Sequence, residues 1–281
     1  MTPAALRGLA ARHGIRPRKS LGQHFLVEPA LARRIVELAG VVPGSRVVEV
    51  GAGLGSLTVA LAATGARVLA IEVDERLLAA LREAVGATDR VEVVRADAAR
   101  VDWKELLGVE PWIMVANLPY NVATPVVMRV LEEAPNVQRM LVMVQREVGE
   151  RLAAGPGDEQ YGAVSLRVAY RADASVVRPV ARTVFWPQPN VDSVLVRIER
   201  RPPPVRADER TLMDLIRVSF AQRRKTVRNA LLRFGMASAD ARAALEACGV
   251  GAGTRPEELG LEAFACLADA AGQPGSATGG A

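Results

Sequence analysis

A strand, a glycine-rich turn and the start of a helix follow one another over Val47–Thr58, and this feature most limits how the chain can fold. The run that ends at Val50 has the length and apolar composition of a buried strand. Gly51, Gly53 and Gly55 follow it, and glycines let a backbone approach a ligand with no Cβ between them. The turn therefore predicts a ligand site between a strand and a helix, and a tight turn without a ligand is the alternative.

Apolar strand-like runs alternate with helical stretches from about residue 41 to residue 198, which predicts an α/β fold with a mostly parallel sheet. The expected strands are Arg46–Val50, Arg67–Val73, Val91–Ala96, Trp112–Ala116 and Met140–Gln145, and the expected helices between them include Leu57–Ala63 and Leu77–Val85. Two later strands are expected at Gly162–Tyr170 and Ser193–Glu199, the second because Val194, Val196 and Ile198 alternate with other residues.

The stretch Arg200–Pro204 is the best candidate for a domain boundary, because three consecutive prolines fit neither a helix nor a central strand. With 281 residues the chain can form one large domain and a smaller one. We expect an N-terminal arm and helix over 1–40, a large α/β domain over 41–199, a linker over 200–208, a helical domain over 209–268 and a disordered tail over 269–281.

Several classes of protein are not expected from the composition. No window has the eighteen or so uncharged apolar residues of a membrane span, and the charged N-terminus lacks an export signal, so a cytoplasmic protein is predicted. Cys248 and Cys266 lack metal-ligand spacing and are interpreted as small core hydrophobes. His13 and His24 are the two histidines, so neither a metal site nor a histidine-activated nucleophile is expected.

The net charge is +5, and nearly all of the positive charge is arginine, which forms forked contacts with phosphate and favours nucleic acid as a partner. A compositional bias of the genome would explain the same excess of arginine. The candidate RNA contacts are Arg12, Arg16, Arg18 and Lys19 in the arm and Arg223, Arg224, Lys225 and Arg228 near the C-terminus. A solvated helix face is the alternative for the second cluster.

Two carboxylates follow the second and third strands and point to a nucleoside cofactor. Glu72 lies 21 residues after Gly51, where a carboxylate can accept both ribose hydroxyls. Asp97 follows the next strand and could accept from an adenine amino group. Either residue alone could be a helix cap. A dinucleotide fingerprint fits imperfectly, because Ser56 occupies the position of its third glycine.

The tetrapeptide Asn117-Leu118-Pro119-Tyr120 follows a fourth strand and suits an amino group on a nucleobase. The Asn117 side-chain oxygen and a nearby backbone carbonyl can accept both protons of an exocyclic amine, and the Tyr120 ring offers a face for stacking. Such a base has to leave its own stack to reach the site. A simple strand end followed by an asparagine–proline turn is the alternative.

The glycine turn after an acidic strand residue resembles the cofactor loop of S-adenosylmethionine-dependent methyltransferases. With the other motifs in order, nearly the whole chain resembles the KsgA/RsmA family of ribosomal RNA adenine dimethyltransferases. The motifs that carry the resemblance are Lys19–Leu26, Gly51–Gly55, Glu72, Asp97, Asn117–Tyr120, Gln145–Glu147, Tyr161-Gly162, Phe185–Ser193 and Phe220–Asn229.

The resemblance implies a Rossmann-like class I methyltransferase sheet with a small all-α C-terminal domain. It implies S-adenosylmethionine as cofactor and dimethylation of two adjacent adenosines near the 3′ end of 16S RNA in the 30S subunit or its precursor. We expect a monomer, because the protein would dock on a large particle, and we expect it to bind neither a metal nor a membrane.

The resemblance also assigns site residues. Cofactor contacts fall on His24, Leu26, Gly51, Gly53, Gly55, Glu72, Asp97 and Asn117. Substrate contacts fall on Asn117, Leu118, Pro119 and Tyr120, with Phe185 as the candidate for the second face of the base, although core packing explains Phe185 nearly as well. His24 stands where many relatives carry Asn, so its polar contact is a departure from the family pattern.

Three alternative functions remain at this point. An Erm-type enzyme would dimethylate large-subunit RNA and confer antibiotic resistance. A non-catalytic RNA-binding or transcription factor could use the same fold, although an intact Asn117–Tyr120 argues against it. An NAD-dependent oxidoreductase is disfavoured by Ser56 and by the lack of a hydride-transfer histidine or Tyr–Lys pair.

Overall fold

The computed structural model describes residues 1–18, 21–222 and 225–272, and the chain divides into two compact units. Unit 1 consists of Met1–Leu152 and Asp173–Arg200, and unit 2 consists of Ala153–Ala172 and Arg201–Ala281. Unit 1 ends at Arg200, immediately before the proline-rich stretch.

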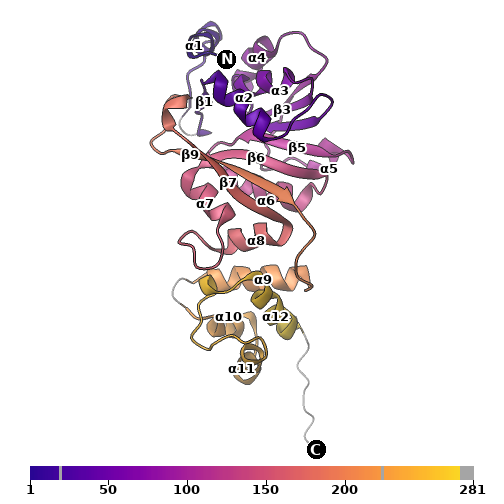
Figure 1. Ribbon diagram of the computed structural model, residues 1–281, viewed down its shortest axis with the longest axis vertical. Helices are drawn as coiled ribbons and strands as arrows, with labels where there is room; N and C mark the ends of the chain where they lie inside the picture. Colours follow the sequence, from indigo (N-terminus) through magenta and orange to yellow (C-terminus); the bar gives the residue numbers. More distant parts are fainter. Residues whose placement is uncertain (19–20, 223–224, 273–281) are drawn as a thin grey trace, which may run out of the picture. The chain divides into compact units, whose positions relative to one another are not determined.

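Unit 1 is built on a seven-stranded sheet in the order β4-β3-β2-β5-β6-β9-β7 (Figure 1). The strands are β2 (Arg46–Val50), β3 (Arg67–Glu72), β4 (Val91–Arg95), β5 (Trp112–Asn117), β6 (Val137–Gln145), β7 (Ala172–Val180) and β9 (Ser193–Arg200). Strands β2 to β6 pair in parallel, whereas β9 runs antiparallel to β6. The chain order reverses between β2 and β5, and ligands of such sheets bind at this reversal, outside the carboxyl ends of the strands.

Helices cover both faces of this sheet (Figure 1). They are α2 (Pro29–Leu38), α3 (Ser56–Ala62), α4 (Glu75–Val85), α5 (Trp103–Leu107), α6 (Ala123–Glu133) and α7 (Arg146–Ala153), whereas α1 (Pro3–Arg12) packs against α4. Helix α4 shows why the sequence forms them: Asp74 caps its first turn, and Leu77 and Leu81 recur with helical spacing on its buried face.

A separate two-stranded sheet joins the N-terminal arm to a late segment of the chain. Strand β1 (Phe25–Leu26) pairs antiparallel with β8 (Phe185–Trp186), so that Leu26 lies opposite Phe185. A short 3-10 helix, η2 (Arg182–Val184), precedes β8. The arm residues next to β1 are thereby fixed beside the reversal point of the large sheet, where Phe25 lies close to Gly53.

Unit 2 is helical and has its own apolar core. Its elements are α8 (Ala163–Arg171), α9 (Glu209–Phe220), α10 (Val227–Phe234), α11 (Ser238–Ala247), η3 (Pro256–Glu258) and α12 (Leu261–Gly272). Leu212, Leu231 and Phe264 come from three of these helices and are fully buried in one cluster.

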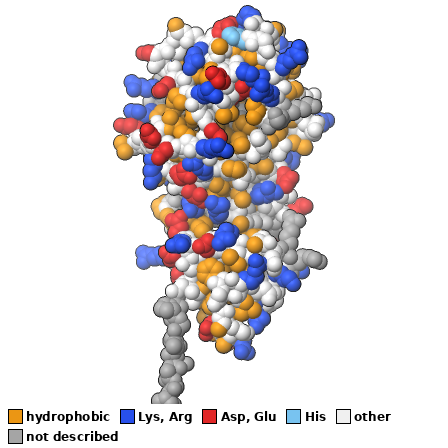
Figure 2. Space-filling model, turned by 180° about the vertical axis from the view of Figure 1, so that it is seen from behind, with side chains coloured by type: hydrophobic (Ala, Val, Ile, Leu, Met, Phe, Trp, Pro, Cys, Tyr) orange, Lys and Arg blue, Asp and Glu red, His pale blue; other side chains and the backbone are white. Residues whose placement is uncertain are grey.

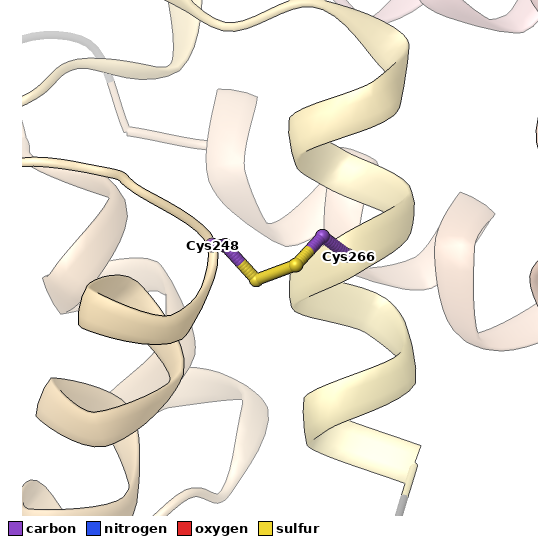
Figure 3. The surroundings of a disulfide bond; sticks show 2 residues. All are labelled: Cys248 and Cys266. Atoms are coloured by element: carbon purple, nitrogen blue, oxygen red, sulfur yellow. A yellow bond between two sulfur atoms is a disulfide. The ribbon is translucent and has the colours of Figure 1, made fainter.

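Cys248 and Cys266 form a disulfide that joins the end of α11 to α12 (Figure 3). The interpretation of these cysteines as separate core hydrophobes is therefore wrong. Their spacing of 18 residues matches no metal motif, and only the packing of the two helices brings their Cα atoms to 5.8 Å.

The structure confirms the α/β class and the predicted strands along β2 to β6 and β9, but the strand predicted at Gly162–Tyr170 is wrong. This segment is helix α8, in which Leu166 and Tyr170 lie four residues apart and face the core of unit 2. Its valines are β-branched and so favour a strand locally, but the burial of one helical face outweighs this preference. Within the described residues, no helix is both long and apolar enough to cross a membrane.

Candidate active site

A cavity opens in unit 1 at the carboxyl ends of β2, β3, β4 and β5, where the order of the sheet reverses. Its empty volume is about 1040 Å³, including the part that is open to solvent. The predicted site residues that line it are His24, Leu26, Gly51, Gly53, Glu72, Asp97, Asn117, Leu118, Pro119 and Tyr120. Residues separated by almost a hundred positions in the sequence therefore meet in one site.

The glycine turn forms one wall of the cavity. Gly51 and Gly53 have φ angles of 73° and 60°, which favour glycine. A Cβ on Gly51 would lie 3.2 Å from Pro119 Cδ, and a Cβ on Gly53 would lie 3.0 Å from the Phe25 ring. Both glycines are therefore needed for the close approach of the turn to the neighbouring walls.

Gly55 has a different role from the two glycines before it. It is not among the described residues that line the cavity, although the sequence assigns it to cofactor binding. A Cβ on Gly55 would lie 3.0 Å from Leu81 Cδ1, so this glycine allows α3 to begin against α4.

The Glu72 carboxylate is buried at the end of β3 and held by two backbone groups. Gly53 N–H donates to Oε2 at 2.8 Å, and Asp74 N–H donates to Oε1 at 2.9 Å. Desolvation raises the pKa of Glu72, and the backbone hydrogen bonds oppose that shift. These two bonds fix the orientation of the carboxylate and leave further lone pairs as acceptors for a ligand's hydroxyl groups.

Glu49 is a second buried carboxylate in the cavity wall, and the sequence marks it only as an acidic residue in a strand. It is 2 % exposed, and its Oε2 has no hydrogen-bond partner in the described part of the chain. Desolvation raises the pKa of Glu49 to about 8, with the nearby Glu72 charge acting in the same direction and Thr58 against it. An unpartnered acceptor of this kind suits a cationic or hydrogen-bonding ligand group.

Asp97 lies at the more open end of the cavity, after β4. Its side chain is 44 % exposed, accepts from Ala99 N–H at 2.9 Å and lies 3.5 Å from the Arg100 guanidinium. It is therefore held in a turn and still accessible from the cavity.

The orientation of Asn117 is set by the N-terminal arm. Its Nδ2 donates to the His24 backbone oxygen at 2.9 Å, so Nδ2 is committed and Oδ1 remains as an acceptor at the cavity wall. Leu118 N–H donates to Met143 O at 3.1 Å, which continues the pairing of β5 with β6. The turn at Pro119 then packs on Gly51.

Tyr120 is held by contacts on its ring and on its hydroxyl group. The His24 ring stacks on it at a centroid distance of 5.3 Å and an interplanar angle of 29°. The Tyr120 hydroxyl lies 2.9 Å from Ser193 Oγ, and burial raises the pKa of the phenol. His24 is itself fixed, because its Nδ1 lies 2.7 Å from Pro187 O and must donate to that carbonyl.

Phe185 does not join this site. Its side chain is 4 % exposed, packs in the core of unit 1 and is not among the described residues that line the cavity. The β1–β8 pairing explains this position, because it directs Phe185 into the core beside Leu26. The prediction that Phe185 stacks on the base thus has no support from its position, and core packing accounts for it.

The predicted RNA contacts lie on different units or outside the described residues. Arg16 and Arg18 are exposed in unit 1, Lys225 is exposed in unit 2, and Arg228 there donates to Ser238 Oγ at 2.8 Å. Lys19, Arg223 and Arg224 lie outside the described residues. Figure 2 shows basic and acidic side chains interspersed on the face that it presents.

Comparisons with known proteins agree with this geometry. The family model described as ribosomal RNA adenine dimethylase matches residues 14–268. The Ribosomal RNA small subunit methyltransferase A of Thermobifida fusca (strain YX) is 49 % identical over 275 residues, which are 96 % of this chain and 95 % of the relative. The protein of the same name from Geobacillus thermodenitrificans (strain NG80-2) is 40 % identical over 280 residues, which are 96 % of each protein.

Solved structures show the same fold. The 23S rRNA methyltransferase ErmE is 27 % identical with a TM-score of 0.68, and the match covers 88 % of this chain and 98 % of ErmE. A dimethyladenosine transferase from Plasmodium falciparum has a TM-score of 0.74 at 23 % identity, over 87 % of this chain and 96 % of that structure. These similarities confirm the predicted class I methyltransferase fold.

Proposed function

The chain belongs to the ribosomal RNA adenine dimethylase family, and from this premise we propose that it dimethylates N6 of two adjacent adenosines near the 3′ end of small-subunit ribosomal RNA. The proposed methyl donor is S-adenosylmethionine. The observation that carries the proposal is the hydrogen bond from Asn117 Nδ2 to the His24 carbonyl, because it leaves Asn117 Oδ1 to accept from an amine in the cavity.

The cavity fits the proposed methyl donor in three respects. Gly51 and Gly53 form a turn in which a side chain on either residue would collide with Pro119 or Phe25, so the turn lines the cavity with bare backbone. The oriented Glu72 carboxylate can accept ribose hydroxyls, and Asp97 can accept from the adenine amino group. The buried Glu49 oxygen without a partner suits the ammonium group at the other end of the donor.

Asn117 and Leu118 would prepare the substrate amine for reaction. The lone pair of an adenine amino group is delocalised into the ring, so the nitrogen is a poor nucleophile. If Asn117 Oδ1 and the Leu118 carbonyl accept its two protons, the nitrogen becomes more tetrahedral and its lone pair points out of the ring plane. S-adenosylmethionine supplies a methyl group on a sulfonium, which is a good leaving group, so these residues contribute mainly by positioning.

Tyr120 would hold the base itself. His24 covers one face of the Tyr120 ring, and its hydroxyl is fixed by Ser193, so the ring is already positioned before a base arrives. A base stacked on the other face of Tyr120 would place its amino group beside Asn117, three residues earlier in the same turn. His24 thus supports both residues proposed to bind the substrate, Asn117 through its backbone carbonyl and Tyr120 through its ring.

The proposed partner is the small ribosomal subunit or its precursor in the cytoplasm, with the protein acting as a monomer and without a metal. Large-subunit RNA is the second candidate, because ErmE shares the fold at 27 % identity. The small subunit is favoured because the relatives at 40 % and 49 % identity are named for it. Labelled cofactor incubated with each purified subunit, followed by mapping of the modified base, separates the two.

Paired substitutions separate the two halves of the proposed site. We expect Asn117→Ala to lower turnover by about 10²-fold or more, because it removes an interaction made with the reacting amine, while cofactor affinity measured by calorimetry stays largely intact. We expect Glu72→Ala to weaken cofactor affinity by about tenfold to a hundredfold, because it removes the ribose acceptor. Unchanged turnover of Asn117→Ala on small subunits would refute the amine-binding role.

A further inference from the structure

Two arginines lie beside the hydrogen-bond partner of Tyr120, and neither has a part in holding the cofactor or the amine. Arg146 begins α7 directly after β6, and Arg182 begins η2. Arg146 is the centre of the Gln145-Arg146-Glu147 motif, for which the proposed reaction has so far supplied no role.

Backbone contacts tie both arginines to the residue next to Ser193. Arg146 N–H donates to Asp192 O at 3.1 Å, and Arg182 N–H donates to Asp192 Oδ1 at 3.0 Å. Ser193, which follows Asp192, lies 2.9 Å from the Tyr120 hydroxyl. Both arginines are therefore anchored one residue away from the partner of the stacking tyrosine.

Arg146 lies at the same end of the sheet as the cavity, beyond the carboxyl ends of the parallel strands. Strand β6 runs parallel to β5, with Met143 opposite Asn117, and Arg146 comes three residues after Met143. At the end of β6, Gln145 pairs with Ser193 on β9. Arg146 therefore follows the carboxyl end of the strand adjacent to the one that carries Asn117.

The charges at this rim favour an anion. The Arg146 side chain is 51 % exposed, and its guanidinium lies 3.7 Å from the Asp192 carboxylate, longer than a hydrogen bond. The Arg182 guanidinium donates to the neutral Asn190 carbonyl at 3.1 Å. Glu147, the acid that follows Arg146 in the chain, lies 2.6 Å from the Arg151 guanidinium. The Arg182 guanidinium thus has a neutral partner, the Arg146 guanidinium lies beyond hydrogen-bond distance of Asp192, and both groups retain donors for a ligand.

We propose that Arg146 and Arg182 bind the phosphates that flank the target adenosine, so that the RNA backbone is held at the rim while the base enters the cavity. This inference rests on the proposed function. A base that leaves its stack carries its sugar and phosphates to the mouth of the pocket, and arginine binds phosphate through paired N–H donors.

The test measures KM for unmethylated small subunits over a range of salt concentrations, together with cofactor affinity by calorimetry. We expect Arg146→Ala and Arg182→Ala each to raise KM by about tenfold and to reduce the slope of log KM against log salt by about 0.7 to 0.9. Cofactor affinity should stay unchanged. Arg146→Lys should restore the slope, because it retains the charge.

Arg46→Ala is the matched control. Arg46 lies at the amino end of β2, whereas the cavity lies at the carboxyl ends of the parallel strands. It lies 3.8 Å from Glu110, much as Arg146 lies 3.7 Å from Asp192. Its KM and salt slope should equal those of the unaltered protein. If Arg146→Ala and Arg182→Ala match the control, or raise KM without changing the slope, the inference is overturned. If the unaltered protein transfers no methyl group to small subunits, the proposed function itself fails.

Discussion

At the scale of single residues, the N-terminal arm decides what Asn117 can bind. The amide of Asn117 could present either its oxygen or its nitrogen to the cavity, and the two choices suit opposite ligands. The His24 carbonyl, 93 positions earlier, accepts from Nδ2 and so directs the oxygen toward an amine. The proposed specificity of the tetrapeptide for an amino group therefore depends on a contact from outside it.

Glu49 should make stability depend on pH. Its pKa in the folded protein is about 8, against an ordinary value of 4.5, because burial disfavours the charged form. Between these two values the unfolded chain releases a proton that the folded chain retains, so the free energy of unfolding falls as pH rises and levels off above about pH 8. One such group contributes a slope of at most about 1.4 kcal/mol per pH unit.

Glu49→Gln removes this proton and should flatten the dependence. Urea denaturation between pH 5 and 8.5 should show the variant gaining stability relative to the unaltered protein as pH rises. Glu72 also has a raised pKa but is present in both proteins, so the difference between them reports Glu49. A constant difference across this range would contradict the raised pKa.

At the scale of elements, the sequence predicts those strands whose apolar residues form a continuous or an alternating run. Arg46–Val50 and Ser193–Glu199 are continuous or alternating apolar runs, and both form strands at nearly those bounds. Gly162–Tyr170 is ambiguous locally, because either a strand or a helix would bury part of it. The helix forms because Leu166 and Tyr170 pack in the core of unit 2, and sequence periodicity over nine residues does not contain that information.

The candidate site shows the same limit. The residues after β2, β3 and β5 could be assigned from the sequence, since parallel strands bring their carboxyl ends together. The positions of Phe185 and Gly55 could not, because both depend on side chains that pack from distant elements. The sequence identifies Glu49 only as an acidic residue in a strand. That its Oε2 has no hydrogen-bond partner among the described residues becomes known only from the folded cavity.

Gly149 should be essential for seating α7 on the sheet. A Cβ at this position would lie 2.2 Å from Val194 Cγ2 and 2.9 Å from Val196 Cγ2, both on β9. We expect Gly149→Ala to lower the free energy of unfolding by about 1–3 kcal/mol through overpacking, measured by urea denaturation.

Gly8→Ala in α1 is the matched control for this effect. Both glycines lie within helices, so both substitutions improve helix propensity, but a Cβ at Gly8 would meet only the end of the Arg12 side chain at 3.6 Å. Gly8→Ala should leave stability unchanged or raise it by up to about 1 kcal/mol. Equal effects of the two substitutions would show that α7 can move away from β9 without cost.

At the scale of the whole molecule, the chemistry and the disulfide belong to different units. The described residues that line the cavity all belong to unit 1, whereas Cys248 and Cys266 lie in unit 2. Unit 2 also contains Ala153–Ala172, where the Tyr161 hydroxyl donates to Leu259 O at 2.8 Å. The composition of the chain changes visibly at the prolines after Arg200, but nothing local marks Ala153–Ala172 as part of the later helical unit.

This division predicts that reduction of the disulfide destabilises unit 2 and spares the cavity. The bond closes a loop between cysteines 18 residues apart, and a loop of that length restricts the unfolded chain by about 3 kcal/mol. Scanning calorimetry should therefore show a transition that moves to lower temperature with a reductant. Cofactor affinity measured well below that transition should be the same in both redox states, because the residues that line the cavity are in unit 1.

The double variant Cys248→Ser, Cys266→Ser supplies the control for the reductant itself. It should unfold at the temperature of the reduced protein and show no further response to reductant, because it has no disulfide to lose. A thermal transition that is identical with and without reductant in the unaltered protein would show that the cross-link adds nothing to the packing of α11 against α12. Weaker cofactor binding on reduction would instead show that the stability of unit 2 is coupled to the site in unit 1.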